Sequence, residues 1–530
     1  MQFIYSFLPV LMTGLTLLVY AWIFGGAQPD KTLAILPWTA ALALEALLFL
    51  PQRREGEDMF SARERCWGGL SRDPLSWLAV AVLLILALPF FNRALCLHCH
   101  YDKVFALFLR SEYAQMTDPV QYAPIFAKLA APSIPQLPFC LEPAEHLTVV
   151  MWFLPSFISM LAAKHALTRH GKRTLMELMA WNGAALAILG FIEIATDAKG
   201  AWWTVPDHKG EFFSSFGYAN MAGSYFALAL GISIGVWRTR VAEAATERLE
   251  YSAEGEGTRP PKTLWIKAHY TLAAVVLNFF GGIATSSRAG LCFAFALAAL
   301  GIVYVIAGIF VGRTDSRKKA GDLLRAVYYI IGAALFILAV FIFAPKETIR
   351  ETFSRTSSFE VVDRIGGKSS EYQKAAWRIF RDHPLWGVGG WGYSHLAIDK
   401  LSDADAKAFV DDRWGSGTAN VHNDYLQFLC EHGIIVMLVF TAMLVLLLAP
   451  LFRTWYNLSR QIRFEKRKSR LPAHPYFIYV LPPGAFWIFL GCICVFVHAF
   501  ADCPLRSPAN LSLLLVAIAC ISGYLPNMDK

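Results

Sequence analysis

One histidine stands at the head of a short amphipathic stretch, and its chemistry is the most specific feature of the chain. Residues 421–434 read VHNDYLQFLCEHGI, with His422 near the start and an apolar segment following from about Ile434. An unperturbed imidazole titrates near pH 6.5, roughly, so at neutral pH it can accept a proton from an attacking hydroxyl. His422 is therefore the candidate general base, with Asn423 and Asp424 beside it as candidate substrate-binding residues.

The elements that must position this histidine are membrane helices. The chain has 530 residues, 56% of them hydrophobic, and a mean hydropathy of +0.43, whereas soluble domains are about 45–50% apolar. A spanning helix needs roughly 20 apolar residues. About twelve such windows occur, near residues 4–23, 32–51, 76–95, 146–163, 175–196, 218–237, 268–284, 290–311, 326–344, 434–452, 476–499 and 508–525. We expect an all-α integral membrane protein with about 12 transmembrane helices forming a single polytopic domain over residues 1–530.

Basic residues are spread over every second loop rather than gathered on one face, although the formal net charge is +8. This pattern argues against nucleic acid as a partner and, by the positive-inside rule, predicts that both termini are cytoplasmic. The N-terminus lacks a charged region and a cleavage site, which predicts a retained first span. The long loop 345–433 then faces outward and carries His422. Loops of this length are usually functional.

Four further side chains could bind an anionic substrate on the outward side. Arg288 stands between two apolar segments, and Asn220 begins the segment at 218–237. Arg506 follows Asp502 in the last outward turn, and Lys209 precedes Asn220. Arginine offers a fixed fork of donors that suits phosphate. The plainer alternatives are a topological anchor for Arg288, a helix cap for Asn220 and an Asp502–Arg506 pair within the turn.

Two motifs suggest cofactors but lack the expected context. Residues 387–392 match G-x-G-x-x-G without the strand and helix that a dinucleotide site needs, so a turn that lets backbone approach a neighbour or a ligand is favoured. Cys96-Leu-His-Cys99-His100 has the spacing of haem attachment. A disulfide from Cys96 or Cys99 to Cys140 is favoured over haem. We expect no cofactor.

Five sequence features in a fixed order resemble those of the O-antigen ligase and polymerase superfamily. They are the Gly-Tyr-Ala-Asn220 helix entry, Ser287-Arg288, the turn at 384–389, His422-Asn-Asp-Tyr-Leu with Gly433, and the segment 498–506, His-Ala-Phe-Ala-Asp-Cys-Pro-Leu-Arg. The resemblance covers roughly residues 196–525, whereas the first five windows match only by hydropathy.

The resemblance implies a GT-C-like, metal-independent membrane glycosyltransferase at the outer, periplasmic face of the bacterial inner membrane. Its donor is a glycan on undecaprenyl pyrophosphate, and its acceptor is lipid A core for a ligase or a lipid-linked glycan for a polymerase. His422 corresponds to the family's essential histidine and Arg288 to its pyrophosphate-binding arginine. Ligases commonly place another arginine before the position of Asn220. This chain lacks that arginine. Lys209, Arg506 or Arg378 is the candidate replacement.

Two mechanisms and a different class of protein stay open at this level. Direct displacement at the sugar inverts its anomeric centre, whereas a two-step route needs a carboxylate nucleophile, for which Asp424 is the candidate. We expect the inverting route. A secondary transporter with about twelve spans is the remoter alternative, but such proteins show similar halves and ionisable residues near mid-membrane, which this sequence does not display.

Overall fold

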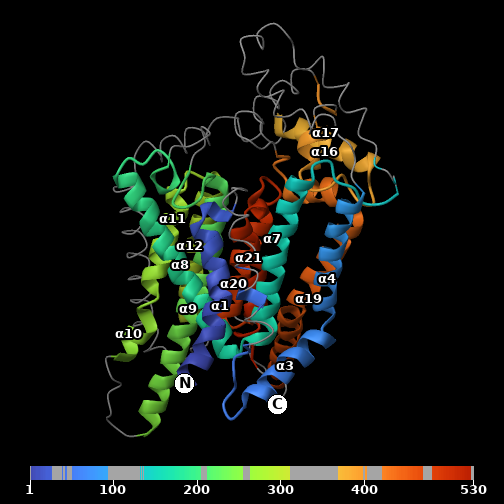
Figure 1. Ribbon diagram of the computed structural model, residues 1–530. Helices are drawn as coiled ribbons and strands as arrows, with labels where there is room; N and C mark the ends of the chain where they lie inside the picture. The colour runs from blue at the N-terminus through green and yellow to red at the C-terminus, as the bar shows by residue number, and fades with distance from the viewer. Residues whose placement is uncertain are drawn as a thin grey trace.

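Apolar helices fill most of the hydropathy windows and pack side by side in the computed structural model (Figure 1). Among the described residues, six helical stretches are long and apolar enough to cross a membrane, and four shorter helices are also apolar. The protein is a multi-pass membrane protein, as predicted. The windows 32–51 and 326–344 lie outside the described residues, apart from isolated positions in the first. The structure describes residues 2–26, 39, 42–44, 50–92, 132, 134, 136–204, 212–254, 263–310, 368–397, 400–402, 420–469 and 480–526.

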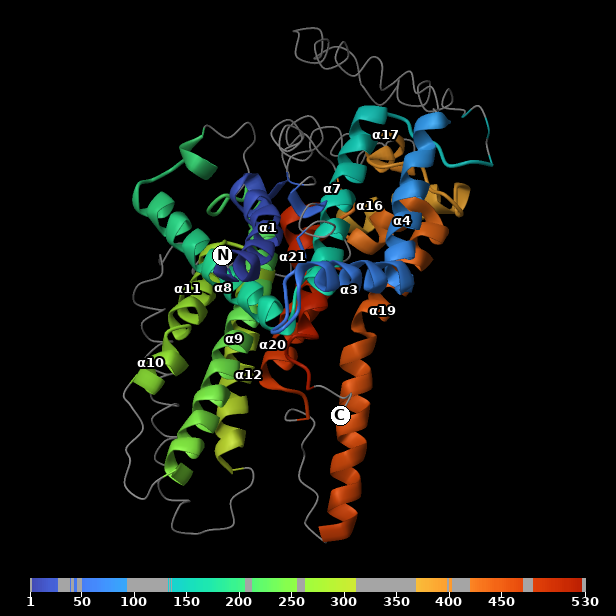
Figure 2. The ribbon, with the colours of Figure 1, turned by 60° about the horizontal axis from the view of Figure 1, so that its bottom comes forward.

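The bundle helices follow the windows in chain order. They are α1 (Gln2–Trp22), α4 (Pro74–Ala87), α7 (Pro143–Leu161), α8 (Arg169–Ala195), α9 (Ala219–Glu254), α10 (Thr263–His269), α11 (Leu272–Ala284), α12 (Arg288–Phe310), α19 (Asp424–Ser469), α20 (Pro483–His498) and α21 (Pro508–Ile521). Three further helices are α3 (Met59–Arg72), α16 (Lys368–Asp382) and α17 (Gly392–Leu396). Helix α3 runs across one end of the bundle, while α16 and α17 stand above the other end (Figures 1 and 2).

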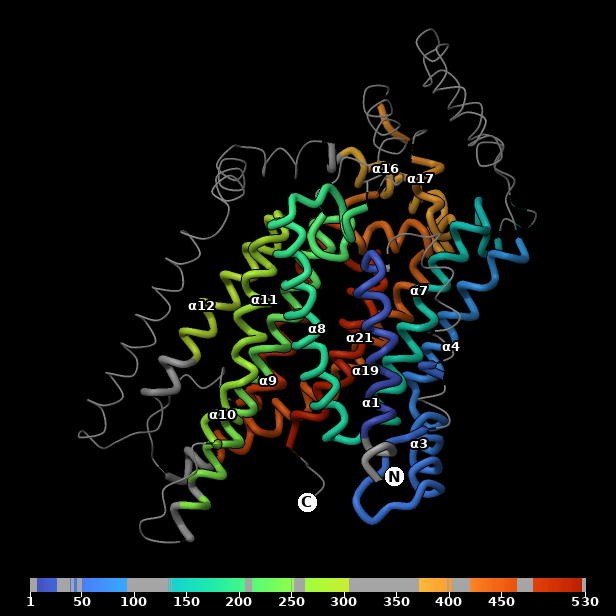
Figure 3. The backbone as a smooth tube through the Cα atoms, turned by 60° about the vertical axis from the view of Figure 1, so that its left-hand side comes forward, coloured from blue at the N-terminus to red at the C-terminus, as the bar shows by residue number. Residues whose placement is uncertain are grey.

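Two helices form the centre of the bundle. Helix α9 packs against α8, α11, α12 and α20, and Figure 3 shows α8, α11 and α12 grouped with it. Helix α21 packs against α1, α7 and α20, and each of its residues is buried. It begins with Pro508 in its first turn, as predicted, where the missing N–H costs no helical hydrogen bond. The turn between α20 and α21 is therefore held between two buried helices.

Helix α19 is broken once, at Gly433. Its backbone there has φ +73° and ψ 176°, which lies outside the helical region. Only glycine adopts this conformation readily. The break separates a short helical segment, residues 424–432, from the long apolar helix that starts at Ile434, as predicted. The Ile434 N–H donates to Pro384 O at 2.9 Å. The turn at Pro384 and the break in α19 thus hold each other in place.

Gly433→Ala should destabilise the protein strongly. A Cβ atom at this position would lie 2.2 Å from Leu385 O, and the positive φ alone costs on the order of 1–3 kcal/mol for a residue with a side chain. We expect a lower midpoint of thermal unfolding in detergent. Gly56→Ala is the matched control, because Gly56 has φ +76° with nothing within 4 Å of its Cβ position. Equal losses in both variants would show that the contact with Leu385 contributes nothing.

A small outer core joins the described parts of the long loop to the bundle. Its buried side chains come from α16, from α17 and the residues flanking it, from the segment before α7, and from the short segment of α19 and the residues just before it: Phe139, Leu141, Tyr372, Ala375, Ala376, Ile379, Val388, Tyr393, Ala397, Val421 and Cys430. Helix α16 confirms the amphipathic helix predicted at 369–381. Its apolar face, including Ile379, supports the short segment that follows His422.

Candidate active site

The His422 side chain lies against a carboxylate that the last outward turn, between α20 and α21, provides. His422 Nδ1 lies 3.0 Å from Asp502 Oδ1, although the two residues are 80 positions apart. The His422 side chain is 39% exposed and the Asp502 side chain 6%. His422 also has φ +54°, a left-handed conformation that is uncommon for a residue with a side chain and that fixes the direction of the ring. A buried anion thus orients a partly exposed imidazole.

Asp502 is bonded on its other oxygen to the entry of α9. Its Oδ2 accepts from Tyr218 Oη at 2.9 Å and from the Asn220 amide. Ser287 Oγ in turn donates to Asn220 Oδ1 at 2.8 Å. We call these five residues the His422 network: His422, Asp502, Tyr218, Asn220 and Ser287. Asn220 therefore bonds to Asp502 in the site, whereas the plainer alternative expected it only to cap a helix.

The network keeps Asp502 ionised. Burial raises the pKa of this carboxyl, but the hydrogen bond and charge of His422, the charge of His498 and the bond from Tyr218 outweigh burial and hold the pKa well below its usual range. Burial and then the Asp502 charge raise the pKa of Tyr218 well above its usual range, so the phenol stays a donor. An ionised Asp502 favours the His422 tautomer with its proton on Nδ1, which leaves Nε2 able to accept a proton.

Arg288 lies beside the network in the sequence, directly after one of its members. It is the first residue of α12 and directly follows Ser287, whose Oγ accepts from Gly290 N at 3.2 Å. Its side chain is half-buried. A cation at the start of α12 adds to the free N–H groups of a helix N-terminus, where anions bind favourably.

Arg506 occupies a different environment from the one expected for a phosphate ligand. Its guanidinium is bonded to Glu431 and lies 4.2 Å from the centre of the Trp391 ring. The residue is only 9% exposed. The pair with Asp502 that the turn sequence suggested does not form, because Asp502 bonds to His422 and Arg506 to Glu431.

The two neighbours of His422 start the short segment of α19. Asn423 Oδ1 accepts from Leu426 N at 3.1 Å, as a helix cap does. Asp424 is buried, and its Oδ2 accepts from Leu505 N at 2.7 Å. The carboxylate of Asp424 thus bonds to the backbone of the α20–α21 turn.

The glycine-rich turn at 387–392 packs against protein backbone. Gly387 has φ +68°, and a Cβ there would lie 2.4 Å from Glu431 O. Gly389 N donates to Glu431 O at 2.8 Å. The favoured hypothesis of a close backbone approach is confirmed, and the neighbour is the short segment of α19.

Arg378 is not brought to the network. Arg378 is exposed on α16 and donates to Lys400 O. Lys209 lies outside the described residues, as do Cys96 and Cys99. Cys140 is buried, and its Sγ lies 3.4 Å from Pro89 O.

Potential ligand atoms of His422, Asp502 and Cys503 all lie within 4.8 Å of one another. Asp502 Oδ1 already accepts from Cys503 N at 2.9 Å as well as facing His422. Nitrogen, oxygen and sulfur ligands of these types suit a small metal ion. Treatment with EDTA tests whether activity depends on one.

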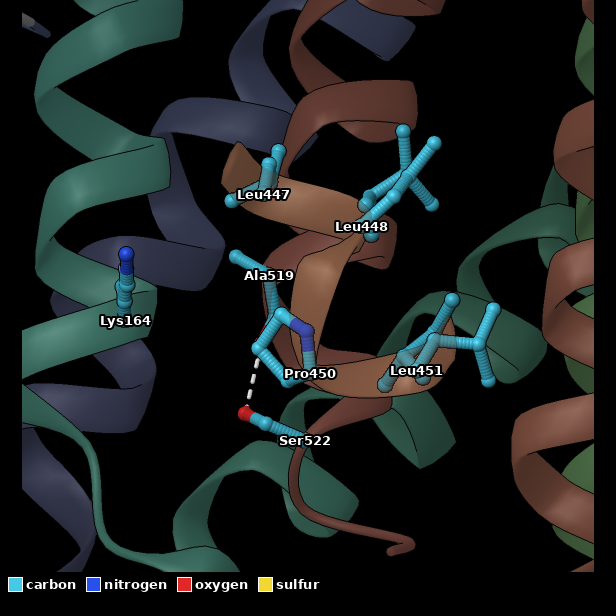
Figure 4. Close-up of a pocket in the computed structure, with 9 residues that line it drawn as sticks. Lys164, Leu447, Leu448, Pro450, Leu451, Ala519 and Ser522 are labelled. Atoms are coloured by element: carbon cyan, nitrogen blue, oxygen red, sulfur yellow. Dashed lines mark hydrogen bonds between the residues drawn. The ribbon is translucent and has the colours of Figure 1, made fainter. Parts of the chain in front are cut away.

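Two pockets differ sharply in their relation to the network. One, of about 110 Å³, lies beside the short segment of α19 and includes Asp424 and Arg506 in its wall. The other, of about 20 Å³, lies between the lower part of α19 and the end of α21 (Figure 4). Lys164 at the second pocket is paired with Asp73 at 2.6 Å. Only the first pocket adjoins the candidate active site.

The match to a known family covers the middle of the chain. Residues 273–441 match the family model described as O-antigen ligase. This segment is similar to the O-antigen ligase superfamily. The matched segment contains Arg288, the glycine-rich turn and His422. No curated protein matches the chain. The match supports glycan transfer of the ligase or polymerase type in general.

Sequence reasoning missed Asp502 as the partner of His422 and Tyr218 as a donor to Asp502. Both residues lie outside the matched segment 273–441, next to the ends of α20 and α9, which pack together. The available signal was the acidic residue in an outward turn between two apolar helices, where an ionisable group is a functional candidate.

Proposed function

We propose that this protein transfers a glycan from undecaprenyl pyrophosphate to a sugar hydroxyl of lipid A core. The reaction takes place at the outer face of the inner membrane, with both termini cytoplasmic and residues 345–433 on the periplasmic side. The observation that carries the proposal is the half-exposed His422 imidazole oriented at 3.0 Å by the buried Asp502 carboxylate. It lies within the segment that matches O-antigen ligases.

The proposed chemistry is a single displacement. The acceptor oxygen attacks the anomeric carbon as its proton moves to His422 Nε2, and the bond between that carbon and the pyrophosphate oxygen breaks. Undecaprenyl pyrophosphate leaves with the electron pair. Asp502 stabilises the imidazolium that forms, as an oriented carboxylate does in a His–Asp pair. Attack opposite the leaving group inverts the anomeric centre.

Arg288 is proposed to bind the pyrophosphate, where negative charge grows as the bond breaks. Arg288→Ala should lower kcat/KM for transfer by about 10²–10³-fold, the usual cost of losing one donor to a developing anion. The measurement uses a defined lipid-linked oligosaccharide and purified protein in detergent or nanodiscs. Arg381→Ala is the control, because Arg381 is exposed on α16. Unchanged kcat/KM in Arg288→Ala would remove the assignment.

The test of the function offers one donor and two acceptors. Wild-type protein receives undecaprenyl-pyrophosphate oligosaccharide with lipid A core, with a second lipid-linked glycan, or with both. Glycan on lipid A core supports the ligase. Longer lipid-linked chains without modified core support the polymerase, which shares the same residues and is the alternative. If no product forms with either acceptor, the proposal of glycan transfer is rejected.

Removal of divalent ions should leave the transfer rate unchanged. In the proposed mechanism His422 activates the acceptor and Arg288 stabilises the leaving group, so no step needs a metal. The rate is measured before and after EDTA treatment, followed by addition of Mg²⁺ or Zn²⁺. A loss with EDTA that Zn²⁺ restores would instead assign His422, Asp502 and Cys503 as metal ligands, since their ligand atoms lie within 4.8 Å.

A further inference from the structure

The larger pocket has one charged end and one apolar end. It lies along the upper part of α19, where that helix faces α7, α20 and α21, and encloses about 110 Å³. Asp424, Glu431 and Arg506 line one end. Phe440 and Leu444 line the other, deeper along the helix. An occupant that fits both ends is amphiphilic.

At the charged end of the pocket, the central ion pair of Arg506 and Glu431 has no net charge. Arg506 and Glu431 are bonded to each other, and both are buried. The second terminal nitrogen of Arg506, Nη1, is buried and has no hydrogen-bond partner among the described residues. Such a donor calls for an acceptor, because an unsatisfied buried N–H is unfavourable. The acceptor must be uncharged, because Glu431 already balances the guanidinium and Asp424 adds only negative character.

The apolar end is built of aromatic rings and opens sideways. Phe153, Phe428 and Phe440 form a mutual cluster with ring centres 5.6–6.0 Å apart. Thr441, which also lines the pocket, is exposed. It lies within the apolar stretch of α19, so the opening faces the hydrocarbon of the membrane. A chain could therefore enter the pocket directly from the bilayer.

We propose that this pocket binds one acyl chain of a membrane glycerophospholipid, whose ester carbonyl accepts a hydrogen bond from Arg506 Nη1. The ester supplies a neutral acceptor at the end of an apolar chain, which matches both ends of the pocket. An isoprenoid chain brings no acceptor, and its pyrophosphate would place negative charge beside Glu431 and Asp424. The chemistry of the walls thus favours an acyl lipid over the glycan carrier.

The bound lipid supports the candidate active site from behind. Leu505 and Asp424 both line the pocket, and Asp424 Oδ2 accepts from Leu505 N at 2.7 Å. The same turn carries Asp502, the partner of His422. Filling the pocket stabilises this turn, so glycan transfer depends on acyl lipid even when donor and acceptor are saturating.

The test is photo-crosslinking in nanodiscs. One arm contains phosphatidylglycerol with a diazirine in its acyl chain near the ester; the other contains undecaprenyl phosphate with a diazirine in its chain. Labelled peptides are mapped by mass spectrometry. We expect the phosphatidylglycerol probe to label the pocket segments of α7 and α19, around Phe153 and Phe440, several-fold more than the undecaprenyl probe does. Stronger labelling there by the undecaprenyl probe would overturn the proposal.

Two variants make the test specific. Thr441→Trp places a bulky ring in the opening and should reduce pocket labelling several-fold, whereas Leu438→Trp, on an exposed side chain of the same helix, should not. The double variant Arg506→Met, Glu431→Met removes the donor without leaving a buried charge unpaired; it should also reduce labelling. Equal labelling in wild type and Thr441→Trp, or in wild type and the folded double variant, would contradict the proposed site. These readouts measure binding and do not depend on the proposed glycan transfer.

Discussion

His422→Ala should reduce glycan transfer by about 10²–10⁴-fold, the range expected when a general base is lost. The donor should still bind, because Arg288 and Asn220 are untouched. We therefore expect kcat to fall while the KM for the lipid-linked donor changes little. Single-turnover transfer to lipid A core measures the chemical step directly. Activity within about tenfold of wild type would contradict the assignment, since an essential proton acceptor contributes more than this.

A matched control exists at the other end of the bundle. His165 Nε2 lies 2.8 Å from Asp73 Oδ2, so the chain contains a second His–Asp pair with similar geometry and no relation to the network. His165→Ala should leave kcat within a few-fold of wild type at temperatures where the variant stays folded. A large loss in both variants would point to stability rather than chemistry.

Asp502→Asn should produce the second largest loss, on the order of 10²–10⁴-fold in kcat. The substitution keeps the shape of the side chain but removes the anion that holds the Nδ1 proton of His422 and stabilises the imidazolium. Tyr218→Phe removes one donor to Asp502 Oδ2 and keeps the bond from Oδ1 to His422. It should cost about tenfold or less, in line with one hydrogen bond of about 1 kcal/mol.

The pH profile separates orientation of the ring from simple loss of structure. The pKa of Asp502 is held well below its usual range. A carboxyl with a lowered folded-state pKa contributes stability above its unfolded pKa and loses it as the pH falls through the folded value. Asp502 therefore stays ionised between about pH 5 and 8. An ionised carboxylate favours a protonated neighbouring imidazole, so Asp502→Asn should move the acid limb of transfer to lower pH. An unchanged profile would reject direct contact in the working enzyme.

Hydropathy predicted the helices because apolar length is a local property of the sequence. The windows at 146–163 and 508–525, for example, coincide with α7 and α21 to within a few residues at their starts. The start of the apolar helix near Ile434 was also predicted, whereas the break at Gly433 was not, because the two segments were expected to run straight into each other.

The pairing of side chains was only partly predictable. His422 and Asn220 were marked by their outward positions, and the fold does bring them to the same carboxylate, Asp502. The partners of Asp502 and Arg506 were not, because they depend on which helix faces pack. Local spacing favoured an Asp502–Arg506 pair, but the α19 segment places Glu431 next to Arg506 and His422 next to Asp502. Sequence spacing alone carries no information about such contacts across 75 and 80 positions.

The order in which the network residues occur along the chain has a consequence for biogenesis. Asn220, Ser287 and His422 are all synthesised before Asp502, which completes the network only when the α20–α21 turn has formed. A nascent chain halted before that turn contains the proton acceptor without the carboxylate that orients it. The contact between His422 and Asp502 therefore forms only after every residue from α1 to α20 has been synthesised.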